Sequence, residues 1–204
     1  MRMPYEAIFF DFDGVLADSE PVHFACWQEI LEPFGVPLDW DTYARHGIGA
    51  SDRMLVRMLC SRVDPPADFE LVYAEYPRKR DLFRMRMLEL QPFSAELCRL
   101  LPELRDYPKA VVTSSGQPEV EPVLIRAGLR KYFTAAVFGG DVKKHKPEPE
   151  PYLLAIERLG VRSGLAIEDS DAGEQSARAA GLEVLRVSTP AEVPVLLRQK
   201  LTGY

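Results

Sequence analysis

The chain has 204 residues, of which 47% are hydrophobic and 27% are charged. This length and composition provide one sizeable core, with room for a smaller satellite domain, and exclude a chain that is disordered throughout. The formal net charge is -6 at pH 7, which argues against broad attraction to nucleic acid or to anionic lipid. We therefore expect neither nucleic acid nor a membrane as a partner.

The cysteines and the apolar runs indicate the compartment. Cys26, Cys60 and Cys98 are far apart in the sequence, and an odd number without a CxxC pair argues against a disulfide framework. The apolar run at 7–10 is too short for the hydrophobic region of a signal peptide, and no stretch approaches the length of a membrane span. We expect a cytoplasmic protein that is a monomer or a weak dimer.

Short apolar runs rich in strand-forming residues recur along the chain, and they are separated by helical patterns. Strands alternating with helices indicate an α/β fold with a parallel sheet covered on both faces. The strands are expected at 7–10, 110–113, 135–138 (the weakest pattern), 165–168 and 184–187. The helices between them are expected at 94–104, 119–127, 151–159 and 172–180.

The segment 18–88 interrupts this alternation. Its helix-like patterns cover 21–34, 51–62 and 68–89, with no buried strand between them. We predict a helical cap domain at 18–88, inserted after the first strand, and a catalytic core formed by 1–17 and 89–204. Ligands of open α/β sheets bind at the carboxyl ends of the strands, so an insertion there can close over the site.

Polar side chains follow four of the expected strands. In a parallel sheet all four loops open on the same edge, so these residues are expected to share one pocket. They are Asp11 and Asp13, then Thr113 with Ser114 and Ser115, then Lys146, and finally Glu168 with Asp169.

The acids in this predicted pocket point to a metal site. Asp11, Asp13, Glu168 and Asp169 would repel one another strongly unless a cation lay among them. An all-oxygen ligand set suits Mg²⁺, which commonly bridges carboxylates to a substrate phosphate. Lys146 adds a further positive charge, and these groups together suit the stabilisation of a transferring phosphoryl group.

Each remaining role is a hypothesis about phosphoryl transfer. Asp11 is the expected nucleophile, because an aspartate can form an acyl phosphate. Asp13 would protonate the leaving oxygen and then deprotonate the attacking water. Thr113 and Ser114 would bind phosphoryl oxygens, and Lys146 would neutralise charge between the phosphate and Asp11.

Each cluster alone also has a simpler interpretation. A D-x-D-G segment is common in turns, and Thr113 could be an ordinary helix cap. A calcium loop is excluded because Leu16 and Val22 stand where its glycine and glutamate would be required. The order of the clusters, each after a strand, favours the catalytic interpretation.

Four motifs together resemble the haloacid dehalogenase superfamily, in the branch of small sugar-phosphate phosphatases and β-phosphoglucomutase. The motifs are FFDFDGVLADSE at 9–20, VVTSS at 111–115, GGDVKKHKPEPE at 139–150, and AIEDS at 166–170 followed by Gly173 and AAG at 179–181. The resemblance covers nearly the whole chain. It implies a Rossmann-like core, a four-helix cap after the first strand, and magnesium dependence. It also implies that the backbone carbonyl of Asp13 coordinates the metal.

The resemblance also narrows the chemistry. Halide-removing members lack the second aspartate of the first motif, so Asp13 favours phosphate chemistry. His23 and Trp27 fall where the mutase keeps a similar pair, and Lys79 falls near a lysine that related caps present to the substrate. Ala50 stands where the mutase places the arginine that binds a second phosphate, and Arg53 is out of register. Hydrolysis is therefore favoured over isomerisation.

The sequence thus predicts a magnesium-dependent phosphatase that hydrolyses a small phosphorylated metabolite, with sugar phosphates as the first choice. A β-phosphoglucomutase-type phosphomutase is the alternative enzyme. A phosphoacceptor domain or a binding module is the alternative without turnover. The late position of Glu168 and Asp169 and the long helical insertion are foreign to phosphoacceptor domains.

Overall fold

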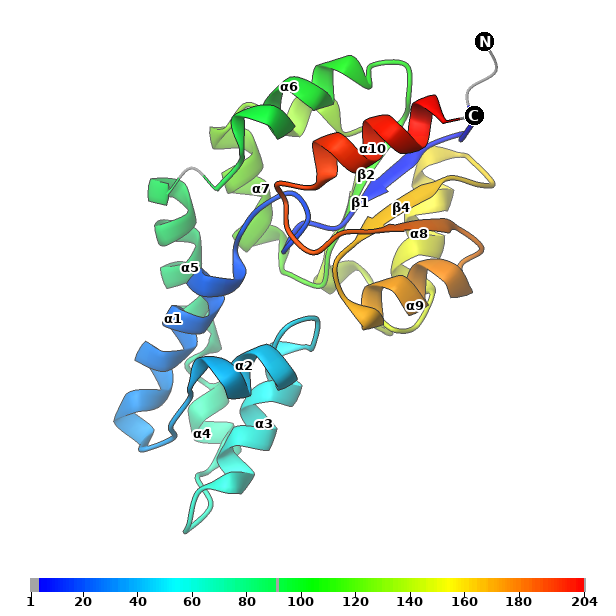
Figure 1. Ribbon diagram of the computed structural model, residues 1–204. Coiled ribbons are helices and arrows are strands. Elements are labelled where there is room, and N and C mark those ends of the chain that lie inside the picture. Colours follow the sequence, from blue (N-terminus) through cyan, green and yellow to red (C-terminus); the bar gives the residue numbers. More distant parts are fainter. Residues whose placement is uncertain (1–3, 91, 204) are drawn as a thin grey trace.

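The computed structural model describes residues 4–90 and 92–203. Within these residues a parallel sheet of five strands has the order β3-β2-β1-β4-β5, with β1 at its centre (Figure 1). The strands are β1 (Ile8–Phe10), β2 (Lys109–Val112), β3 (Ala135–Val137), β4 (Leu165–Glu168) and β5 (Glu183–Arg186).

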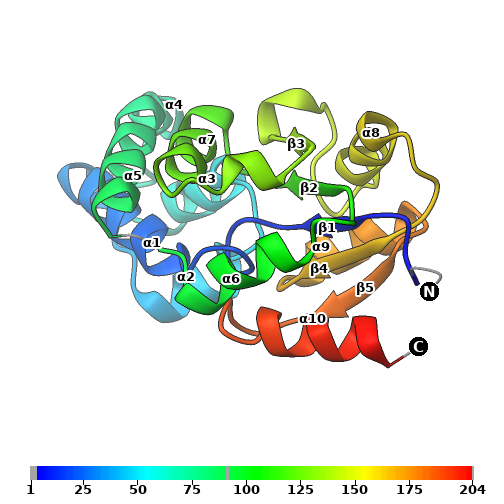
Figure 2. The ribbon, with the colours of Figure 1, turned by 90° about the horizontal axis from the view of Figure 1, so that it is seen from above.

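Helices cover both faces of the sheet (Figure 2). Ile8 and Phe10 pack on one face in a cluster with α6 (Ala95–Glu103), α7 (Gln117–Arg126) and α10 (Val193–Thr202). Phe9 packs on the opposite face with α8 (Glu150–Leu159) and α9 (Asp171–Ala179). All three β1 side chains are fully buried, because both faces of a central parallel strand are covered.

A helical region lies between β1 and α6, beyond one end of the strands (Figure 1). Its own apolar cluster includes Trp27, Leu31, Leu55 and Val72. Helix α5 packs against α1 and also against α7 of the core, so it joins the two parts. The helices are α1 (Glu20–Leu31), α2 (Trp40–His46), α3 (Asp52–Arg62), α4 (Phe69–Tyr73) and α5 (Tyr76–Leu90).

Short 3₁₀ turns complete the described structure. They are η1 (Glu32–Phe34), η2 (Arg130–Tyr132) and η3 (Gly139–Asp141). Among the residues described, no helix combines the length and the apolar character that crossing a bilayer requires.

The α/β fold with a parallel sheet and a helical insertion is confirmed, and every expected strand lies within one residue of its predicted bounds. The insertion departs from prediction in two places. The helix expected at 68–89 is divided into α4 and α5 at residues 74–75, because Pro77 has no N–H to bond the carbonyl of Tyr73 four residues earlier. Instead of the four cap helices that the resemblance implies, the described residues form α1 to α5.

Sequence patterns missed two helices. Helix α2 is capped by Asp39, whose carboxylate accepts the Thr42 N–H at 2.6 Å, but it is too short for a clear helical period. Helix α10 contains Pro194 in its first turn, where proline is well tolerated. The domain boundaries at 17/18 and 88/89 stay predictions.

Candidate active site

A pocket of about 360 Å³ lies between the sheet and the helical region. Asp11, Asp13, Ser114, Lys146 and Asp169 line it on the side of the sheet. On the opposite side, the helical region supplies mainly polar lining residues: Glu20, His23, Tyr43, Ser51, Asp52, Arg53, Tyr73 and Tyr76.

The register of the sheet brings the motif residues together. Phe10 of β1 pairs with Val111 of β2 and with Ile167 of β4, so these three strands end at about the same level. Asp11 follows Phe10 directly, and its N–H donates to the Ile167 carbonyl at 3.1 Å. Residues that follow these parallel strands therefore meet at one edge, as the sequence predicts.

Three carboxylates form a candidate metal site. Asp11, Glu168 and Asp169 each offer an oxygen, and the three oxygens lie within 4.8 Å of one another. Burial raises the pKa of Asp11 well above its ordinary value despite Lys146. Burial and the nearby Glu168 raise the pKa of Asp169 to about 7. Glu168 Oε2 is buried and has no hydrogen-bond partner among the described residues, so the three carboxylates fit a cation that would offset their repulsion.

Lys146 joins the candidate nucleophile to the acidic cluster. Its Nζ lies 3.2 Å from Asp11 Oδ1 and 2.6 Å from Glu168 Oε1, and it donates to the Val112 carbonyl at 3.0 Å. Burial would lower the pKa of this lysine, but Asp11 and Glu168 raise it above its ordinary value. The hydroxyl of Tyr152 also donates to Glu168. Lys146 therefore remains a fixed positive charge beside Asp11.

Asp13 is surrounded by hydrogen-bond donors. Oδ1 accepts from the Ser19 hydroxyl and from His23 Nε2, the latter at 3.2 Å. Oδ2 accepts from the Ser115 hydroxyl at 2.7 Å and from the Thr113 hydroxyl at 3.4 Å. Burial would raise the pKa of Asp13, but His23, Ser115 and Ser19 together hold it well below its ordinary value. The side chain is thus an oriented carboxylate.

Gly14 allows Asp169 to approach the first motif. Its φ is +70°, and a Cβ built on it would lie 1.9 Å from Asp169 Oδ2. We expect Gly14→Ala to displace this carboxylate and to weaken Mg²⁺ binding about tenfold or more, as measured by calorimetric titration. Gly128→Ala is the matched control, because Gly128 also has φ +70° but a Cβ there would meet no atom of the described residues within 4 Å. Equal Mg²⁺ affinity in the two variants would contradict the steric argument.

The predicted cap residues have different placements. His23 lines the pocket and contacts Asp13. Arg53 lies on the lining, 3.7 Å from Glu70, with its guanidinium stacked 5.1 Å from the centre of the Tyr73 ring. Trp27 and Lys79 are fully buried and lie outside the lining. A direct substrate contact of either one stays a prediction that this geometry does not support.

The predicted phosphate-binding residues differ in whether they line the pocket. Ser114 and Lys146 lie on the lining, whereas Thr113 is 2% exposed and lies behind it. The Thr113 hydroxyl accepts the Ser115 N–H at 3.0 Å, so it orders the loop after β2. Direct binding of phosphate by these residues stays a prediction.

The sequence predicts Ser115 in the pocket but not its side-chain contact with Asp13, and it predicts no role for Ser19, Glu20 or Tyr43. Ser115 and Ser19 belong to motifs that were recognised, so their contacts with Asp13 could have been proposed from their positions. Tyr43 donates to Glu20 at 2.6 Å across the pocket lining, and the two residues are on different helices. No spacing pattern reveals a pair of this kind, because the contact depends on helix packing.

The sequence of this chain is similar to a family of hydrolases and to named phosphatases. The model of the haloacid dehalogenase-like hydrolase family matches residues 8–187. A phosphorylated carbohydrates phosphatase of Thermotoga maritima is 33% identical over 180 residues, which cover 87% of this chain and 82% of the relative. A fructose-1-phosphate phosphatase of Escherichia coli is 33% identical over 189 residues, covering 90% and 96% of the two chains.

A solved structure agrees over a similar range. The crystal structure of a CbbY variant from Rhodobacter sphaeroides, in complex with xylulose-(1,5)bisphosphate, superposes with a TM-score of 0.78 at 26% identity. The match covers 92% of this chain and 89% of that chain. The family match, which includes β1, the helical region and the later strands, shows that the chain belongs to the haloacid dehalogenase-like hydrolases.

Proposed function

We propose that this phosphatase hydrolyses a small sugar phosphate through a phosphoaspartate at Asp11, with Mg²⁺ as its cofactor. The observation that carries the proposal is the placement of Asp11, 3.2 Å from Lys146 and beside Glu168 and Asp169, on a pocket whose opposite wall is polar. This arrangement provides a nucleophile, a fixed positive charge and cation ligands within one site.

The reaction would proceed in two steps. The Asp13 carboxylate would take up a proton when the negatively charged ester binds, because the added negative charge raises the pKa that its hydrogen bonds lower in the free enzyme. Asp11 then attacks the phosphorus of the ester while Asp13 gives this proton to the leaving alcohol oxygen. The Asp13 carboxylate then takes a proton from water, and the resulting hydroxide attacks the phosphorus of the acyl phosphate. Inorganic phosphate and free Asp11 are released, and Asp13 is again protonated.

Asp11, Glu168 and Asp169 would hold the cation, with the backbone carbonyl of Asp13 as a further proposed ligand. When bound, Mg²⁺ would offset the repulsion among the carboxylates and draw charge from the phosphoryl oxygens. Lys146 would supply a further positive charge between Asp11 and Glu168. Thr113 and Ser114 would complete the binding of the phosphoryl oxygens.

The substrate class follows from the pocket wall and from the relatives. The names of the Thermotoga maritima and Escherichia coli relatives describe phosphatases of carbohydrate phosphates. Here the helical side of the pocket presents Glu20, Tyr43, Ser51 and Asp52. Carboxylates and hydroxyls can form hydrogen bonds with the hydroxyl groups of a sugar. The carboxylates of Glu20 and Asp52 disfavour a substrate with a second anionic group.

Arg53 bears on the alternative of a phosphomutase. A mutase must bind a bisphosphate, and Arg53 is the one arginine among the described lining residues. Its guanidinium is engaged by Glu70 at 3.7 Å and by the rings of Phe69 and Tyr73. This geometry favours hydrolysis, because no uncommitted cation of the helical side faces the pocket in the described residues.

The test is a panel of phosphate esters assayed with Mg²⁺. We expect inorganic phosphate to be released from sugar monophosphates, with little release from phosphoglycolate and none when EDTA is present. β-Glucose 1-phosphate should be supplied with a glucose bisphosphate primer, and it should yield glucose rather than glucose 6-phosphate. Isomerised product would favour the mutase, and a stable phosphoprotein without release would favour a phosphoacceptor. The cytoplasmic location and the monomer or weak dimer stay predictions.

A further inference from the structure

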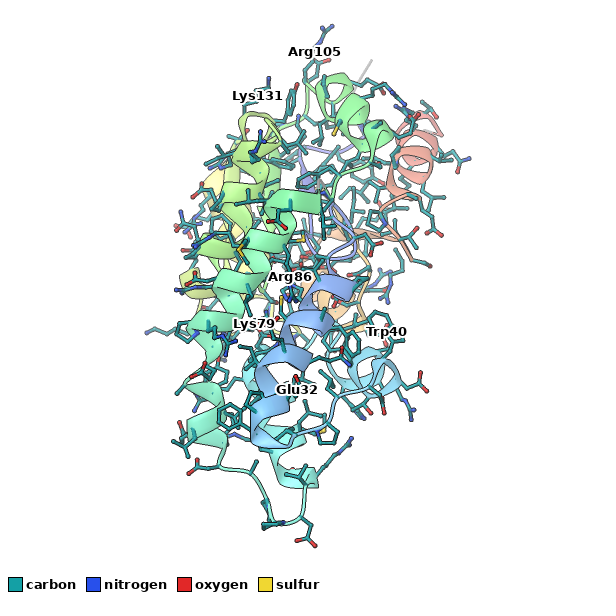
Figure 3. The ribbon with its side chains drawn as sticks, turned by 90° about the vertical axis from the view of Figure 1, so that its left-hand side faces the viewer. Glu32, Trp40, Lys79, Arg86, Arg105 and Lys131 are labelled. Atoms are coloured by element: carbon teal, nitrogen blue, oxygen red, sulfur yellow. The ribbon has the colours of Figure 1, made fainter. Side chains whose placement is uncertain are left out.

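A buried lysine connects the helical region to the core. Lys79 of α5 is fully buried and lies where α5 faces α1 (Figure 3). Its Nζ lies 3.0 Å from Asp52 Oδ2, 3.5 Å from Glu119 Oε1 and 2.8 Å from His23 Nδ1. An ammonium group has three protons, so each proton has one of these acceptors. The arrangement is complete without a substrate.

Two acids keep this lysine charged. Burial would lower the pKa of Lys79, but Asp52 and Glu119 raise it above its ordinary value. Asp52 also accepts from the indole N–H of Trp27 at 2.6 Å. Because a buried charge is costly without partners, these acids fix the position of the ammonium group.

Glu119 is the member of this group that comes from the core. It lies on α7, its side chain is 1% exposed, and its Oε2 accepts the Gly116 N–H at 2.9 Å. The Tyr76 hydroxyl of α5 donates to the same oxygen at 3.4 Å. Glu119 is therefore held by its own helix while it contacts α5 of the helical region.

The contact with Lys79 determines which ring nitrogen of His23 carries a proton. An ammonium group only donates hydrogen bonds, so Nδ1 must accept and Nε2 carries the proton that points to Asp13 Oδ1 at 3.2 Å. Burial and Lys79 lower the pKa of His23, but Asp13 and Glu20 outweigh them and raise it. A second ring proton would nevertheless have to sit on Nδ1, where it would oppose the ammonium protons across the 2.8 Å contact. The hydrogen-bond geometry therefore selects the neutral ring.

We propose that Glu119 is a positioning residue for Asp13, acting through Lys79 and His23. The proposal rests on the proposed function, in which Asp13 protonates the leaving group. Glu119 fixes Lys79, Lys79 fixes the tautomer and orientation of His23, and His23 orients Asp13 Oδ1. The His23 hydrogen bond to Asp13 is therefore fixed when the helical region contacts α7, which couples this contact to the chemical step.

The kinetic test compares Glu119→Gln with Glu121→Gln. Glu121 lies on the same helix but accepts a hydrogen bond from Arg130 at 3.1 Å, so Glu121→Gln should release alcohol at the wild-type rate. We expect Glu119→Gln to slow single-turnover release of alcohol from a sugar phosphate about tenfold to a hundredfold. Release of nitrophenolate from 4-nitrophenyl phosphate should fall much less, because a good leaving group needs little protonation. A general loosening of the fold would slow both esters equally.

The nitrogen NMR spectrum of the His23 ring provides a second test. The chain has three histidines, so a His23→Gln spectrum identifies the signals. The wild type should show a neutral ring protonated on Nε2, and Glu119→Gln should show a mixture of ring forms. An imidazolium or an Nδ1-protonated ring in the wild type overturns the proposal, as do equal losses on both esters. If the wild type hydrolyses no ester, the proposed function fails, while the wild-type spectrum still decides on the tautomer.

Discussion

Asp11→Asn is expected to abolish turnover, with phosphatase activity lower by about ten thousandfold or more. An asparagine amide has the shape of the carboxylate but cannot accept the phosphoryl group as an acyl phosphate. The substitution also removes one of the three clustered carboxylates. Activity should therefore be measured over a range of Mg²⁺ concentrations, to separate lost nucleophilicity from weakened cation binding.

Two observations would check the assignment of the nucleophile. Asp106→Asn, which changes an exposed loop aspartate, should retain wild-type activity and so controls for preparation. Acid-quenched wild-type enzyme should carry one added phosphoryl group on Asp11, located by peptide mass analysis after borohydride trapping. Wild-type activity in Asp11→Asn, or a phosphoryl group on another residue, would contradict the mechanism.

Lys146→Met should have the second-largest effect, on activity and on stability together. The Lys146 side chain is 3% exposed and lies between Asp11 and Glu168, so its removal leaves two buried carboxylates without their shared cation. Loss of this charge beside the phosphoryl group should reduce kcat about a hundredfold to a thousandfold. Breaking such a buried pair should also lower the free energy of unfolding by about 3–5 kcal/mol.

Added Mg²⁺ distinguishes the effect of Lys146→Met on stability from its effect on kcat. A more negative cluster should attract the divalent ion more strongly, so Mg²⁺ should raise the Tm of Lys146→Met more than that of the wild type. It should not restore kcat. Lys144→Met changes an exposed lysine of the same loop and should leave both properties unchanged. Recovery of full activity at high Mg²⁺ would argue against a separate role for Lys146.

The sheet and its motif residues could be predicted from sequence because both depend on local patterns. Ile8 to Phe10 form an apolar run that is buried on both faces of the sheet, and Asp11 follows directly. Parallel connection then places the ends of β1, β2 and β4 side by side. The position of Asp11 near Asp169 follows from topology, without detailed knowledge of packing.

The helical wall of the pocket could not be predicted in the same way. The resemblance predicts a substrate contact for Lys79, whereas the structure shows its ammonium group in contact with His23, Asp52 and Glu119. These partners come from three other helices, so the outcome depends on how four helices pack. A single sequence specifies which side of each helix is apolar, but not the rotation and distance between neighbouring helices.

Insertion of the helical region between two adjacent strands has a consequence for how new specificities can arise. The chain leaves the sheet after β1 and returns through α6 to β2, the neighbour of β1. Residues of α2 and α3 can therefore be exchanged without shifting the hydrogen-bonded pairing of either strand. Selection for a different ester could act on this interchangeable portion, while Asp11 and its surroundings continue to perform the same reaction.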